Sequence, residues 1–230
     1  MDTSQPQHTN RQYEEELRGL RAGLLKMGGM VERQIADAVE ALVERDIPKA
    51  RQNIARDTEV NRMDVEIDER CIRLLALHQP AASDLRFITT GLKITTDLER
   101  IGDNAVNISE RVLELSEQPQ IKPYIDIPRM AEIAQSMVKD SLDAFVRDDT
   151  ALAQEVIQRD DEVDGLNYQI YRELLSYMAE DPSTIARATQ ILFISKYLER
   201  IADHATNIAE MVVYMVMGRT IRHMDKKQSR

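Results

Sequence analysis

Apolar side chains recur every three or four residues along most of the chain, which is the period of an amphipathic helix. The first series begins at Tyr13 and continues through Leu, Met, Val and Ile residues to Leu42, which predicts a long helix. Asp46 and Pro48 mark a turn and the beginning of a second helix, because Asp caps helices and Pro is accepted in a first turn. We expect this second helix to end near Leu77.

Prolines predict the next two boundaries. Pro80 interrupts the apolar period, and a third helix is expected from about Asp84 to Glu117. Residues 119–128 then hold three of the seven prolines. Because proline at that density cannot continue a helix, this segment is predicted to be a linker.

The second half of the chain repeats the first. The phrase LERIGDNAVNISE at residues 98–110 returns as LERIADHATNIAE at residues 198–210, with nine of thirteen positions identical. Upstream of this phrase the apolar residues of the two halves correspond at an offset of 103, as Val39 does to Leu142. The chain therefore reads as two copies of one three-helix unit, whose long helices and short turns favour antiparallel packing.

The composition agrees with helix packing: 43% of residues are apolar, only 4% are aromatic, and Gly and Pro together number fifteen. We predict an all-α fold of two tandem, pseudo-symmetric three-helix bundles. The predicted parts are a disordered tail at 1–10, a first bundle at 11–118, a proline-rich linker at 119–128, a second bundle at 129–218 and a basic tail at 219–230.

The net charge of −10 disfavours a nucleic-acid-binding protein, which would need a basic face for phosphate contacts. The N-terminus lacks the apolar segment of a signal peptide, and the longest apolar run, at residues 211–217, is too short to span a bilayer. We therefore expect a cytoplasmic protein without membrane insertion. The single cysteine, Cys71, lies within an apolar helical pattern and is interpreted as a small buried hydrophobic residue.

Two adjacent glycines, Gly28 and Gly29, lie inside the first predicted helix. Each costs about 1 kcal/mol relative to alanine in a helix interior. They indicate either a close helix crossing or a tolerated weak position, and the pattern alone favours neither.

Acidic residues form a second stripe on the repeated helices, opposite the apolar stripe. On the third predicted helix and its repeat the stripe comprises Glu99, Asp103, Asn107 and Glu110, then Glu199, Asp203, Asn207 and Glu210. The second helix and its counterpart carry Asp57, Asn61, Asp64 and Asp68, then Asp160, Asp164, Asn167 and Tyr171. Helical geometry predicts that the acidic stripes point away from the core.

These stripes are either ordinary solvated faces or cation sites. A solvated face usually alternates charges at i, i+4, whereas Glu99 and Asp103 place like charges there. Carboxylates brought together from two helices suit hard or borderline cations such as Mg, Mn or Fe. His204 could add a ligand, but its equivalent is Asn104, so a surface role is favoured. Arg100 and its counterpart could pair with neighbouring carboxylates as structural ion pairs.

Three stretches resemble the PhoU family of phosphate-uptake regulators: MGGMVERQIADA, IDERCIRLLALHQPAASDLR and the repeated LERI phrase. The likeness covers about residues 12–223. The resemblance implies two three-helix bundles with (Glu/Asp)-x-x-x-Asp motifs that bind metal clusters on the bundle surface.

Carried over to this sequence, the resemblance implies metal ligands at Glu99, Asp103, Glu199, Asp203, Asp160 and Asp164. One motif departs from the family pattern, because Asp57 is followed four residues later by Asn61. Because Asn is a neutral and weaker ligand, the half-site at Asp57 is then expected either to hold fewer ions or to rely on Asp64. The expected ions are Fe, Zn, Mn or Mg.

The resemblance also implies a function. The protein is expected to be a non-enzymatic, homodimeric negative regulator in the cytoplasm, acting as an adaptor between the ATPase subunit of the phosphate ABC transporter and its sensor histidine kinase. Two alternatives stay open from the residues: a carboxylate-bridged metalloenzyme, and a plain helical scaffold in which the acidic stripes only increase solubility.

Overall fold

The structure, a computed structural model, describes residues 5–219, and every regular element in that range is a helix. The elements in chain order are α1 (Gln5–Glu44), α2 (Ile47–His78), α3 (Ala82–Ser116), α4 (Asp126–Arg147), α5 (Thr150–Glu180), the short 3-10 helix η1 (Pro182–Thr184) and α6 (Ile185–Met217). The predicted all-α class is confirmed.

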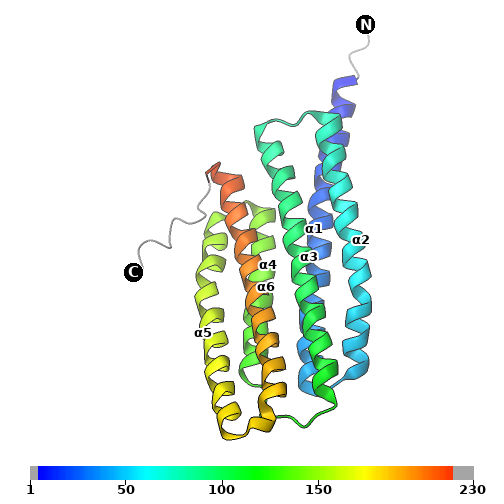
Figure 1. The fold of residues 1–230 in the computed structure, drawn as a ribbon. Helices are drawn as coiled ribbons and strands as arrows, with labels where there is room; N and C mark the ends of the chain where they lie inside the picture. The colour runs from blue at the N-terminus through cyan, green and yellow to red at the C-terminus, as the bar shows by residue number, and fades with distance from the viewer. Residues whose placement is uncertain (1–4, 220–230) are drawn as a thin grey trace.

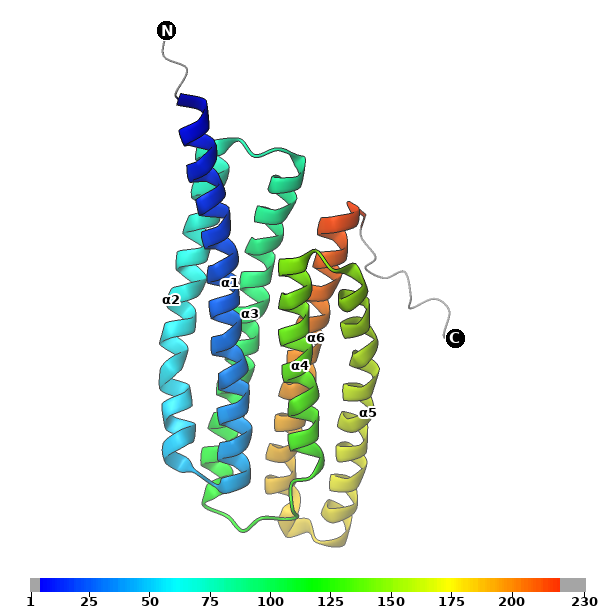
Figure 2. The same ribbon diagram turned by 180° about the vertical axis from the view of Figure 1, so that it is seen from behind.

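The helices form two three-helix bundles that lie side by side (Figure 1). Helices α1, α2 and α3 contact one another, and α4, α5 and α6 do the same. The bundles meet through α1 against α4 and α3 against α6, so α2 and α5 lie on the two outer sides (Figures 1 and 2). In each of these meeting pairs the two helices run in opposite directions, as the approximate two-fold relation of the repeats requires.

One continuous apolar core runs through both bundles. Side chains from the repeated phrase lie at its centre: Leu98 and Ile101 on α3, and Leu198 and Ile201 on α6, are fully buried. Cys71 is also fully buried, as its apolar context predicted, and burial raises the pKa of its thiol to about 12.

The two halves repeat their polar packing as well as their apolar packing. Arg56 on α2 pairs with Asp37 on α1 at 2.6 Å, and Arg159 on α5 pairs with Asp140 on α4 at the same distance. The offset between the two pairs is 103 for both residue types. Identical ion pairs at one offset indicate that the duplicated helices kept their relative rotation.

Helix-capping aspartates begin the helices as predicted. Asp46 accepts a hydrogen bond from the backbone N–H of Lys49 at 2.9 Å, and Asp149 accepts two from the first turn of α5. Asp181 accepts from the backbone N–H of Ser183, although the turn that follows is 3-10 before α6 begins. Each cap satisfies an N–H that the helix leaves unpaired.

Helix α1 begins at Gln5 rather than at Tyr13, so residues 5–10 of the expected N-terminal tail are helical. The apolar period detects only the turns that pack against a neighbour, and the first turns of α1 extend past the other helices of its bundle (Figure 2). Residues 1–4 of that tail, and all of the expected basic tail except Arg219, lie outside the described residues.

The predicted linker is shorter than expected, because α4 already begins at Asp126. Pro128 is the third residue of this helix, where its missing N–H removes no intrahelical hydrogen bond. Backbone carbonyls of the remaining connection accept hydrogen bonds from two arginines: Arg45 donates to the carbonyls of Ser116 and Gln118 at 2.6 Å, and Arg187 donates to that of Pro119 at 2.8 Å.

The two glycines of α1 have different roles. A Cβ atom at Gly28 would overlap Cδ1 of Leu142 on α4, whereas a Cβ at Gly29 would meet nothing within 4 Å. Gly28 therefore marks a close crossing between the bundles, and Gly29 is a tolerated weak position. Both interpretations left open by the sequence hold, one for each residue.

This difference predicts opposite effects for two neighbouring substitutions. Gly29→Ala should stabilise the protein by about 0.5–1 kcal/mol through helix propensity. Gly28→Ala makes the same propensity gain but must displace the buried Leu142, so it should be less stable than Gly29→Ala by about 1–3 kcal/mol. Urea unfolding of both variants measures the difference, and equal stabilities would contradict the close crossing.

Candidate functional site

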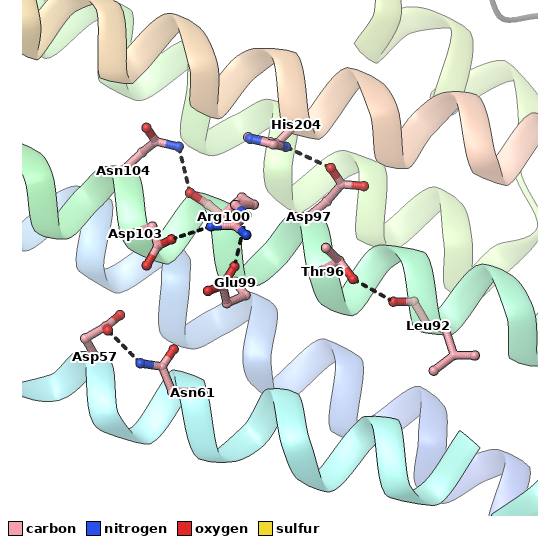
Figure 3. Close-up of polar contacts among 10 residues, drawn as sticks. All are labelled: Asp57, Asn61, Leu92, Thr96, Asp97, Glu99, Arg100, Asp103, Asn104 and His204. Carbon is pink, nitrogen blue, oxygen red and sulfur yellow. Dashed lines mark hydrogen bonds and ion pairs between the residues drawn. The ribbon is translucent and has the colours of Figure 1, made fainter. Parts of the chain in front are cut away.

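Asp57 on α2 and Glu99 and Asp103 on α3 point towards the groove between these two helices (Figure 3). On α3, Arg100 lies between two of them: its Nε is 3.4 Å from Glu99, and its Nη1 is 3.0 Å from Asp103. Across the groove on α2, Asn61 donates a hydrogen bond to Asp57 at 2.8 Å. The pairing predicted for Arg100 is confirmed.

Burial makes this groove unfavourable for negative charge. The side chain of Glu99 is only 25% exposed, and burial, reinforced by Asp103, raises the pKa of Glu99. Burial also raises the pKa of Asp57, with a further contribution from Asp103, and that of Asp64, with a further contribution from Asp68. The predicted ligands of the first bundle are thus electrostatic neighbours. They are half-buried rather than fully solvated, which the helical arithmetic did not predict.

The second bundle repeats the arrangement between α5 and α6. Burial raises the pKa of Asp160 to about 6, with Asp203 and Asp164 adding repulsion. Burial also raises the pKa of Asp203, where Glu199 is the next contributor. Lys196, rather than the arginine equivalent to Arg100, neutralises Glu199 here at 2.5 Å.

The donor chemistry of both grooves fits a hard cation. All eight predicted ligands offer carboxylate oxygens, and one oxygen of Asp57 is buried without a hydrogen-bond partner. Within residues 5–219, however, no three His, Cys, Asp or Glu side chains are placed so that they could hold one metal ion as they stand. Side chains must therefore rotate, with Arg100 releasing Glu99 and Asp103, before several carboxylates can share an ion.

Gln34 on α1 is a polar residue beneath the first groove that the sequence did not single out. It is only 2% exposed, its side chain is directed towards Asp57, and neither atom of its amide has a hydrogen-bond partner in the described part of the chain. Gly102 makes room for it, because a Cβ there would lie 3.2 Å from Oε1 of Gln34. The repeat offset could have revealed it, since the equivalent residue in the second bundle is the apolar Met137.

The sequence favoured a surface role for His204. In the structure it lies instead between the two bundles. Its Nδ1 is 2.8 Å from Oδ1 of Asp97 on α3, and both side chains are largely buried (Figure 3). Its equivalent, Asn104, donates instead to the backbone carbonyl of Arg100 at 2.7 Å. His204 therefore connects α6 to α3, a contact that could not be inferred from the stripe on either helix.

Fold and site together define a class of protein: a duplicated all-helical protein with carboxylate-lined grooves on its outer helix pairs. The PhoU domain model matches residues 24–112 and 127–212, one copy in each bundle. The chain belongs to the PhoU family.

Known relatives extend this likeness along nearly the whole chain. The chain is 44% identical over 222 residues to a protein of Pseudomonas putida named "Phosphate-specific transport system accessory protein PhoU homolog", covering 96% of this chain and 87% of the relative. A protein of Aquifex aeolicus with the same name is 44% identical over 213 residues, covering 93% of this chain and 96% of the relative.

Solved structures agree with the fold. The crystal structure of PhoU from Pseudomonas aeruginosa is similar with a TM-score of 0.87 and 45% identity, covering 90% of this chain and all of that one. The phosphate transport system regulatory protein PhoU from Streptococcus pneumoniae is similar with a TM-score of 0.85 and 32% identity, covering 91% and 99%.

Family membership settles one prediction directly. PhoU proteins are named as accessory or regulatory proteins and form a non-enzymatic family, so the prediction that this chain is not an enzyme is confirmed. Among the helices of residues 5–219, none combines the length and hydrophobicity needed to cross a membrane.

The raised pKa of Asp160 predicts a pH dependence of stability in metal-free protein. Between pH 3.8 and about pH 6, Asp160 keeps its proton in the folded state but has lost it in the unfolded state. The free energy of unfolding should therefore fall as the pH rises through this window. Asp160→Asn should therefore be more stable than the parent at pH 7, by on the order of 1 kcal/mol after allowing for solvent screening. The two should be equally stable below pH 4.

Urea unfolding in EDTA from pH 3.5 to pH 8 measures this effect. Asp161→Asn is the matched control, because Asp161 is the exposed neighbour on the same helix and its substitution should change stability by less than about 0.5 kcal/mol. A loss of stability at pH 7 in Asp160→Asn would contradict the electrostatic cost of this groove.

Proposed function

We propose that the chain is an accessory and regulatory protein of a phosphate-specific transport system, which acts in the cytoplasm to restrain phosphate uptake and phosphate-starvation signalling. The observation that carries this proposal is the 44% identity, over 96% of the chain, to a relative named as an accessory protein of that system. Both bundles match the same domain, so the whole described chain contributes to the role.

The proposed partners follow from the resemblance of the residues to PhoU proteins. The chain would bind the ATPase subunit of the phosphate ABC transporter and the sensor histidine kinase, and so couple the two as an adaptor. A homodimer is proposed on the same ground. Helices α2 and α5 offer outward faces for such contacts, because neither packs against the other bundle.

Metal binding is the proposed role of the two acidic grooves. Glu99 and Asp103, with Asp57 and Asp64, would hold Fe, Zn, Mn or Mg in the first bundle, and Asp160, Asp164, Glu199 and Asp203 would do so in the second. A bound ion would supply the positive charge that half-buried carboxylates lack. Support comes from the oxygen-only donor set, the raised pKa of Asp160 and the unpartnered oxygen of Asp57.

Gln34 would add a neutral donor to the first site. Asp57 and Asp64 are seven residues apart, about 10 Å along the helix, whereas Asp160 and Asp164 are about 6 Å apart. One ion cannot easily contact both carboxylates of the first pair. The buried amide of Gln34 lies beside Asp57 and would turn its oxygen to fill the remaining position.

The regulatory role is tested by deleting the gene in its host. Phosphate-starvation genes should then stay on in medium rich in phosphate, because the negative regulator is missing. Expression of an alkaline-phosphatase-type starvation gene is the measurement, and the intact gene restored on a plasmid is the control. Normal repression in the deletion strain would refute the proposed function.

The metal assignment predicts a loss of bound metal in a double variant. Glu99→Gln with Asp103→Asn removes two charges from the first groove and should remove its metal while leaving the second bundle loaded. Metal per protein, measured by inductively coupled plasma mass spectrometry after dialysis against Mn²⁺, should fall by about half. Thermal unfolding should also lose part of its stabilisation by Mn²⁺.

Matched variants separate this effect from a general change in charge. Glu59→Gln with Glu69→Gln removes two charges from exposed positions of α2 and should leave the metal content unchanged. Gln34→Met, which introduces the residue of the second bundle, should weaken only the first site. Equal metal content in the groove and control double variants would leave a plain helical scaffold as the better explanation of the acidic stripes.

A further inference from the structure

A crevice of about 440 Å³ lies between the two bundles, away from both acidic grooves. It is formed by α1, the first turns of α3, the turn between α4 and α5, and the last turns of α6. In Figure 1 these segments meet near the end of the molecule where α6 finishes. Its lining comprises Glu14, Leu17, Arg18, Arg21, Ser83, Asp84, Arg86, Phe87, Asp148, Met215 and Val216.

Three guanidinium groups line this crevice. The guanidinium of Arg21 lies over the ring of Phe87, 4.8 Å from its centroid. Arg86 donates from Nε to the backbone carbonyl of Met215 at 3.0 Å, which connects α3 to α6 and leaves its two terminal nitrogens available. Arg18 donates from Nε to the carbonyl of Glu14 at 3.2 Å. Two of the three are thus oriented by a neutral partner without neutralisation of their charge.

None of the three forms an ion pair with a carboxylate of the described chain within 4.0 Å. Elsewhere in the fold, arginines such as Arg56, Arg100 and Arg159 do pair with carboxylates. Three unpaired guanidiniums around one cavity indicate a site prepared for a negative ligand.

Three carboxylates also line the crevice, so its formal charge is balanced, but none of them lies within 4.0 Å of the three guanidiniums. Asp84 accepts a hydrogen bond from the hydroxyl of Tyr13 at 3.0 Å, which gives it a partner of its own. Glu14 and Asp148 are exposed, so water and salt screen their charges. The three guanidiniums can therefore act together on a ligand that displaces water from the crevice.

Size and apolar surface narrow the class of ligand. The volume lies in the range of small-molecule sites, which run from about 300 to 1,000 Å³, and far exceeds the needs of a single phosphate ion. Leu17 and Val216 give the crevice an apolar side beside the arginines, whereas Phe87 is only 7% exposed and is covered by Phe145 and Arg21. Planar guanidiniums recognise phosphate oxygens through paired hydrogen bonds. We propose that this crevice binds a small organic phosphate, its phosphate on Arg18, Arg21 and Arg86 and its apolar body against Leu17 and Val216.

Such a ligand would contact both bundles at once, since Leu17 and Arg18 belong to the first and Val216 to the second. Binding would therefore stabilise the relative placement of α1, α3 and α6. This site is separate from the proposed metal grooves, and its failure would leave the regulatory role unaffected.

Phenyl phosphate is the simplest probe of this class, because it joins one flat apolar ring to one phosphate. Isothermal titration calorimetry of the full chain should show saturable binding that weakens with added salt. Inorganic phosphate, which lacks the ring, should bind about tenfold more weakly, and benzyl alcohol, which lacks the charge, should not bind measurably. No saturable binding of phenyl phosphate up to 10 mM, or equal affinity for inorganic phosphate, would overturn the proposal.

Variants locate the binding. Arg18→Gln with Arg21→Gln should weaken phenyl phosphate by at least about tenfold. Arg33→Gln with Arg51→Gln removes the same charge from exposed arginines outside the crevice and should leave the affinity within about twofold. Arg21→Lys keeps the charge but loses the planar fork, so an intermediate loss of affinity is expected. Equal affinities in the crevice and control double variants would refute the site, with circular dichroism showing that each variant is folded.

Discussion

Apolar packing between α3 and α6 is the interaction on which the rest of the structure depends. Helix α3 contacts both other helices of its bundle and α6, and α6 has the equivalent contacts in the second bundle. Fully buried side chains such as Leu98, Ile101 and Ile108 each contribute about 1.5–3 kcal/mol when removed from water. Because α3 and α6 carry the same repeated phrase, equivalent apolar residues pack in the same way in both bundles. The two bundles share a single core.

That packing also dictates the electrostatics of the acidic grooves. The rotation that buries Ile101 places Glu99 and Asp103 beside α2, where neighbouring helices exclude part of the water. Carboxylates held there lose solvation and repel one another. This raises the electrostatic free energy of the folded state, and apolar packing in the core must offset the increase. Arg100 and Lys196 reduce this electrostatic cost through their ion pairs with Asp103 and Glu199. A multivalent cation would reduce it further, which is the physical link between packing and the proposed metal sites.

The sequence predicted most of the fold, because periodicity, proline positions and the internal repeat all report local packing. It predicted the helix order and the capping aspartates, and it missed the first turns of α1, whose sequence has no apolar period. Helical arithmetic grouped the carboxylates correctly but not their burial, which depends on the neighbouring helix. The contact of His204 with Asp97 and the crevice around Arg86 join residues more than 100 positions apart. No pattern along one helix could reveal them.

The two halves repeat their apolar packing and their interhelical ion pairs, but they differ at two buried positions beneath the grooves. Met137 and Val156 fill apolar positions in the second bundle, whereas the first bundle has Gln34 and Asn53 at the same places. A buried amide without a partner costs about 1–3 kcal/mol, so packing alone would favour the apolar residues. Asn53 donates to the carbonyl of Gln34 and to the hydroxyl of Ser109 at 2.9 Å, so the amide left without a partner is that of Gln34, beside Asp57. The first groove thus has a polar neighbour where the second has the apolar Met137, so the two grooves should differ in the field they present to an ion.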